Sequence, residues 1–169
     1  MTALSRRRAV IEFLRRQLVG QQRVPGRERL RAAFGALLGI LLTALVGYLI
    51  LGADSALPWV IAPMGASAVL LFAVPASPLA QPWAMLGGNL SAALIGVACA
   101  HGFKDPLMAG AVAVSAAVAV MFALRCIHPP AGAVALTAVV GGPGIHALGY
   151  GFAVYPVLDR KSTRLNSSH

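Results

Sequence analysis

Long apolar stretches alternate with short polar or proline-rich turns along most of this chain. Uncharged, mainly apolar runs cover residues 32–51, 84–100 and 107–124. A helix of roughly 20 apolar residues is long enough to cross the ~30 Å hydrocarbon layer of a membrane. The pattern therefore predicts three membrane-spanning helices, and a further span is expected to begin at Tyr150–Leu158.

A shorter apolar segment, Leu57–Val74, contains Pro63 and Gly65. Proline has no N–H and clashes with the carbonyl four residues before it, and the residue that precedes it is pushed out of the α region. We therefore expect a half-helix that begins at Met64, followed by a rigid connector over the proline-rich residues 75–82.

A second short segment, Ala131–Val140, follows a break at Arg125–Pro130, where an apolar helix meets an arginine, a histidine and two prolines. Breaking a helix at membrane depth is costly unless the freed backbone faces protein or water. An ionisable side chain at that depth is a functional-site hypothesis. We predict a half-helix from Ala131, ended by a connector at residues 141–144, and a functional site at the break.

The two short segments resemble one another. Pro63-x-Gly65-Ala66-x-Ala68 recurs as Pro130-x-Gly132-Ala133-x-Ala135. Each lies between longer apolar runs, so two units of span, short segment and span fit the order of the chain. Such units would be inverted relative to each other, as in many transporters. The alternative is coincidence in a sequence rich in alanine and glycine.

Composition agrees with a membrane protein. The chain is 58% hydrophobic and only 11% charged, whereas soluble domains are about 25% charged. The predicted fold class is all-α, a polytopic transmembrane helical bundle with two short broken segments. Nine arginines fall within residues 1–31, and basic residues favour the cytoplasmic side. Cys99 and Cys126 are expected to be buried thiols, since two cysteines are too few for a disulfide framework.

Three regions are expected along the chain. Residues 1–31 form a basic cytoplasmic segment, and residues 32–158 form the transmembrane domain. Residues 159–169 are polar and resemble the in-frame translation of a common sequencing adapter, so we interpret them as foreign to the protein. The chain is then expected to be a truncated fragment, and a genuine polar tail is the alternative.

The candidate site lies at the predicted half-helix starts, because helix N-termini present N–H groups and partial positive charge to anions. Few carboxylates lie between the spans, which favours an anion path over a cation path. The alternative interpretation of Arg125 is an anchor at the membrane interface. His128 is interpreted as a donor that caps carbonyls at the break, and a proton-linked role is its alternative. The predicted path comprises Pro63, Gly65, Ser67, Asn89, Arg125, His128, Pro129, Pro130, Gly132 and Thr137.

Other classes of function have little support in the sequence. There is no cysteine, histidine and carboxylate spacing for a metal, no enzyme motif, no cofactor motif, and no motif that would make the basic segment bind nucleic acid. We expect no catalytic residues, no metal and no cofactor.

Several motifs resemble the HPP family of integral membrane proteins. They are His128-Pro-Pro-Ala-Gly-Ala133, Pro63-Met-Gly-Ala-Ser-Ala68, Pro75-Ala-Ser-Pro78 and Gly87-Gly-Asn89. The resemblance implies a multi-pass protein of the bacterial inner membrane. In that family some members resemble fusions with a cytosolic CBS pair, and a plastid branch is associated with nitrite transport.

The resemblance therefore favours a transporter or channel for a small inorganic anion such as nitrite. The alternative is a non-transporting membrane module, a sensor or assembly partner, regulated by a CBS domain that this chain does not show. The expected partners are the lipid bilayer, a small anion and, as an open alternative, further copies of the chain.

Overall fold

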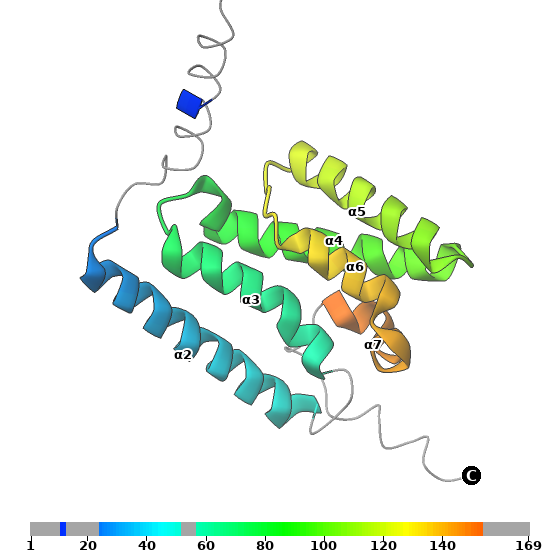
Figure 1. Ribbon diagram of the computed structural model, residues 1–169. Coiled ribbons are helices and arrows are strands. Elements are labelled where there is room, and N and C mark those ends of the chain that lie inside the picture. Colours follow the sequence, from blue (N-terminus) through cyan, green and yellow to red (C-terminus); the bar gives the residue numbers. More distant parts are fainter. Residues whose placement is uncertain (1–10, 13–23, 52–56, 154–169) are drawn as a thin grey trace, which may run out of the picture. The chain divides into compact units, whose positions relative to one another are not determined.

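The structure is a computed structural model that describes residues 11–12, 24–51 and 57–153, without the side chains of residues 50–61. It contains helices and no strands within those ranges (Figure 1). The elements are α2 (Gly26–Leu51), α3 (Leu57–Ala73), η1 (Pro78–Ala80), α4 (Pro82–Gly102), α5 (Pro106–Ala123), α6 (Ala131–Val140), α7 (Gly142–Leu148) and η2 (Gly149–Ala153).

The chain divides after Leu30 into two compact units. In the first unit the described residues hold the start of α2, where Arg29 donates from Nε to the Val24 carbonyl at 2.8 Å. All further elements belong to the second unit. The predicted cytoplasmic segment is mostly outside the described residues, and so is the tail at 159–169.

Among the described residues, three helices are long and apolar enough to cross a membrane, which confirms the three predicted spans. They are Gly26–Leu49, Pro82–Gly102 and Pro106–Ala123. Helix α6 and residues 142–153 form a pair bent by 103°, which is either one broken span or a re-entrant loop. The predicted span from Tyr150 begins as η2, and its remainder lies outside the described residues.

Helix α4 packs against both α5 and α6 through small residues. A Cβ on Gly96 would lie 2.6 Å from the Ala135 carbonyl oxygen of α6. On α5 the buried positions are Ala109, Gly110, Ala113, Ala117 and Met121. Small side chains let helix backbones approach closely in a membrane, where apolar surface gives little drive for helices to associate. The core of the second unit therefore combines many alanine and glycine contacts with a few larger side chains, among them Met121 and Ile145.

Helix α2 meets α3 at one aromatic side chain. Gly35 and Gly39 leave a notch that Phe72 fills, because a Cβ on Gly35 would lie 2.5 Å from Phe72 Cδ1 and one on Gly39 2.8 Å from Phe72 Cε2. Most large side chains on the rest of α2 are exposed, as expected for a helix that faces lipid.

The expected break at Pro63 is wrong. Helix α3 begins at Leu57 and runs through Pro63 to Ala73. Proline within a membrane helix is tolerated when neighbouring groups satisfy the freed backbone. Nearby, the Ser67 hydroxyl lies 3.5 Å from the Pro63 carbonyl oxygen.

The second half-helix is confirmed, since α6 has the predicted bounds of Ala131 and Val140. The connector expected at residues 141–144 is wrong, because α7 begins at Gly142. Pro143 stands in the first turn of α7, where its fixed φ favours a helix start and its missing N–H costs nothing.

Candidate functional site

Helix α5 ends in a tight turn that places Arg125 in a left-handed conformation. Arg125 has φ 54°, and Cys126 N donates to the Met121 carbonyl at 2.9 Å. The Arg125 side chain is exposed, whereas Cys126 is fully buried. Trp83 Nε1, at the start of α4, donates to the Leu124 carbonyl at 3.1 Å. The turn is therefore held by α4, and the positively charged side chain of Arg125 lies outside the core.

His128 links three parts of the chain. Its side chain is fully buried, its Nδ1 lies 2.9 Å from the Leu79 carbonyl oxygen, and its Nε2 lies 2.9 Å from the Ser67 hydroxyl. A carbonyl can only accept, so Nδ1 carries the hydrogen. In the neutral ring Nε2 then accepts from Ser67. The bonds join the break to η1 and to α3. His128 is thus a donor to a carbonyl, as one interpretation expected, but the carbonyl belongs to the connector and not to the broken helix.

The N-terminus of α6 does not present the free N–H groups that the sequence led us to expect. Ala131 N donates to the His128 carbonyl at 2.9 Å, Gly132 N to Pro129 at 3.1 Å and Ala133 N to Pro130 at 3.0 Å. A tight turn through the two prolines supplies these acceptors. Helix α3 starts at Leu57, so Pro63 does not stand at a helix start. Pro130 does precede a helix start, but the first N–H groups of α6 are already hydrogen-bonded.

A cavity of about 90 Å³ lies between α3, α4, α6 and η2. Its lining comprises Pro63, Met64, Asn89, Ala93, Val134, Phe152 and Ala153. Asn89 is half-buried, and its Oδ1 is buried without a hydrogen-bond partner among the described residues. A cavity of this size holds a few water molecules or a small ion. The cavity is therefore bordered by a polar residue, Asn89, whose buried oxygen has no hydrogen-bond partner among the described residues.

The residues predicted for the path fall into two clusters. Ser67, His128 and buried Pro130 belong to the break, whereas Pro63 and Asn89 belong to the cavity. Arg125 and Pro129 are also part of the break, but they are exposed.

The other predicted positions surround these clusters. Gly65 is half-buried with open space at its Cβ position, and Gly132 is half-buried beside Val114 of α5. Thr137 is buried on α6, and its carbonyl accepts from Gly141 N at 2.8 Å.

Sequence reasoning missed the Leu79 carbonyl, Met64 and Phe152. A backbone acceptor and two apolar lining residues leave no signal in an apolar sequence.

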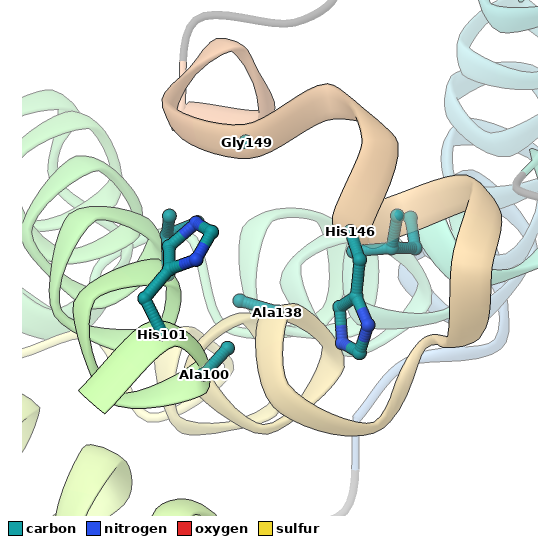
Figure 2. A pocket seen from close by; sticks show the side chains of 7 residues that line it. Ala100, His101, Ala138, His146 and Gly149 are labelled. Carbon is teal, nitrogen blue, oxygen red and sulfur yellow. The ribbon is translucent and has the colours of Figure 1, made fainter. Parts of the chain in front are cut away.

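A second cavity, of about 110 Å³, lies at the other end of α4. His101 from the last turn of α4 and His146 from α7 both line it (Figure 2). These two histidines are far apart in the sequence, and the fold brings them to one cavity.

Together, the long apolar helices, the bent helix pair and the small-residue packing define a multi-pass α-helical integral membrane protein. The family described as "HPP, transmembrane region" matches residues 21–163. The chain therefore belongs to the HPP family, as the motifs around His128 and Pro63 indicated.

Two curated relatives are transmembrane proteins of Dictyostelium discoideum. They are 38% and 37% identical to this chain over 107 residues, which is 61% of the chain. The matched part is 37% of the first relative and 34% of the second, so the chain spans about a third of their length. No solved structure matches the chain.

Proposed function

We propose that the protein carries a small inorganic anion such as nitrite across the membrane, along a path through the Asn89 cavity. The observation that carries this proposal is Asn89, which lines a space of about 90 Å³ and whose buried Oδ1 has no partner among the described residues. An unsatisfied buried polar atom costs about 1–3 kcal/mol. A cost of that size is reasonable where the polar group serves a solute or its water.

The charges of the described helices support an anion over a cation. Between residues 57 and 153 the charged side chains apart from histidines are Lys104, Asp105 and Arg125. Asp105 caps α5 by accepting from Met108 N at 2.7 Å. No carboxylate lines the Asn89 cavity. The Asn89 amide offers N–H donors to an anion, and exposed Arg125 attracts one to the surface at the break.

The membrane and the orientation are part of the proposal. We propose a bacterial inner-membrane protein whose N-terminus is cytoplasmic, because nine arginines precede residue 32 and basic segments are retained on that side. A fluorescent reporter and an alkaline phosphatase reporter, each fused to the N-terminus, test the orientation. Fluorescence without phosphatase activity is the expected result, and the opposite pattern contradicts it.

A second candidate function is a non-transporting membrane module. It is favoured by the hydrogen bonds at the break, where His128 is bonded at both ring nitrogens and the first amides of α6 are occupied. On this proposal the break only shapes the fold and positions a partner.

Nitrite uptake into proteoliposomes that contain the full-length parent protein separates the two functions. Transport predicts uptake that Asn89→Leu and Arg125→Gln abolish while the variants still insert. Ser115→Ala is the control, because Ser115 is exposed on α5 and its hydroxyl bonds Ala111 of its own helix. A well-inserted protein that moves neither nitrite, nitrate, formate nor chloride contradicts transport and favours the module.

A further inference from the structure

The cavity that holds His101 and His146 is separate from the Asn89 cavity. Its lining comprises Val97, Ala100, His101, Ala138, Ile145, His146 and Gly149, and none of these borders the other space. Gly88 of α4 contacts the break at His128, and His101 lies in the last turn of the same helix. The histidine cavity is therefore at the end of α4 that is remote from Arg125.

Two helices end at this cavity. Ala100 and His101 are in the last turn of α4, and Ala138 is in the last turn of α6. The C-terminal end of a helix carries partial negative charge, which favours a cation within the last turn. Two such ends at one small space favour positive charge there.

The hydrogen bond of His146 leaves one of its ring nitrogens able to accept. Nε2 lies 2.9 Å from the Val139 carbonyl oxygen, so Nε2 is the donor. In the neutral ring Nδ1 then carries a lone pair. His101 brings a second imidazole, whose ring centroid is 6.3 Å from that of Tyr150. Both histidine side chains are exposed in the structure.

The residues that line the histidine cavity indicate which cation it can bind. No three or more histidine, cysteine or carboxylate side chains gather anywhere in the part of the chain that the structure describes, so a divalent metal here would have no more than two imidazole ligands, fewer than a zinc site uses. No carboxylate of the described residues lines the cavity. Tyr150 is a further titratable group beside His101, whereas Lys104 and Asp105 lie in the turn after α4 and do not line the cavity. The cation that imidazole lone pairs bind without further ligands is a proton.

We propose that the His101–His146 cavity is a proton-binding site and that its proton is the coupling ion for the anion. A proton from water adds to an imidazole lone pair, where the ends of α4 and α6 stabilise the charge. It leaves to water on the other side with the anion. This inference rests on the proposed transport function.

The test uses proteoliposomes with the full-length parent, the double variant His101→Gln/His146→Gln and the control Lys104→Gln. Nitrite uptake is measured chemically and proton movement with a pH dye, with protein-free liposomes to subtract diffusion of nitrous acid. An inward gradient of one pH unit is a tenfold ratio of proton concentrations across the membrane, and it can drive the anion by up to that factor. We expect it to accelerate nitrite uptake several-fold in the parent and in Lys104→Gln. The double variant should keep only downhill uptake, without acceleration.

Two results overturn the inference while leaving anion transport intact: uptake by the parent that ignores the gradient, or acceleration that survives in the double variant. If the parent moves no anion, the proposed function fails, and ¹⁵N spectra of histidine-labelled protein decide on the site. Each histidine is replaced by glutamine in turn, and the protonation of the remaining imidazole is measured. A change in that protonation supports a shared proton site. Two imidazoles that protonate independently overturn it.

Discussion

Trp83 Nε1 donates to the Leu124 carbonyl across 41 residues of sequence, at 3.1 Å. The bond ties the first turn of α4 to the residue after α5, directly before the left-handed Arg125. It holds a carbonyl that the end of α5 leaves without an intrahelical partner. The indole thus fixes the position of the break.

Replacing Trp83 with phenylalanine should destabilise the break. Phenylalanine keeps an aromatic ring and removes the donor, so a loss of about 1 kcal/mol is expected. Thermal unfolding in detergent measures it. Phe122→Leu, a change at an exposed position on α5, is the control. Equal stability of Trp83→Phe and the parent contradicts a role for this hydrogen bond.

Ser67 and His128 should be energetically coupled. Ser67→Ala leaves Nε2 of a fully buried imidazole without its partner, which should cost about 1–3 kcal/mol. In a double-mutant cycle, the loss of stability in Ser67→Ala/His128→Asn should differ from the sum of the two single losses by about 0.5–3 kcal/mol. Ser115→Ala, which removes an exposed hydroxyl bonded within its own helix, should have little effect. Additive losses at Ser67 and His128 contradict the link.

A methyl group at Gly96 should prevent α4 and α6 from packing. The added Cβ would lie 2.6 Å from the Ala135 carbonyl oxygen and 2.7 Å from Ala138 Cβ, and a helix backbone cannot move aside cheaply. Gly96→Ala should therefore yield little folded protein by size-exclusion chromatography. Gly102→Ala is the matched control, because nothing lies within 4 Å of its added Cβ. Normal yield from Gly96→Ala would contradict this packing.

Asn89→Leu should have opposite effects on stability and on transport. It removes a buried oxygen that lacks a partner and replaces it with an apolar group of similar size, which should stabilise by about 1 kcal/mol. The same change should abolish nitrite uptake. Loss of both stability and uptake would instead indicate that Asn89 is a structural residue. Unfolding in detergent and uptake in liposomes are measured on the same preparation.

Arg125 combines a charge with an unfavourable backbone conformation, and substitutions separate the two. Arg125→Gly should stabilise by about 1 kcal/mol, since glycine adopts φ 54° without the steric cost that a side chain carries. The loss of charge should nevertheless reduce anion uptake. Arg125→Lys keeps charge and strain, and should retain most uptake. If Arg125→Gly transports normally, the charge has no part in the path.

The elements that local chemistry determines were predicted well from the sequence. Helix α6 starts after two prolines and ends at Gly141, and its observed bounds are the predicted ones. Helices α4 and α5 end within two residues of expectation, because proline, glycine and Asp105 mark their ends. The sequence fails at Pro63, where the expected break assumed that proline disrupts a helix in a membrane as it does in water.

The candidate site depends on contacts that no local pattern encodes. The Leu79 carbonyl and Ser67 are 49 and 61 residues from His128, so only the packed fold reveals that the imidazole is bonded at both nitrogens. The same holds for His101 and His146. The anion site expected at α6 was wrong because the two prolines that mark the helix start also place carbonyls against its first amides.

The Ser67–His128 contact also constrains how the protein is made. A ribosome adds about 5–20 residues per second, so α3 leaves it roughly 3–12 s before the imidazole that Ser67 needs. During that interval the Ser67 hydroxyl has only the long contact of 3.5 Å with the Pro63 carbonyl of its own helix. Phe72 in the notch formed by Gly35 and Gly39 has its partner earlier, because α2 is already synthesised. The order of synthesis thus allows the α2–α3 contact to form seconds before the Ser67–His128 contact.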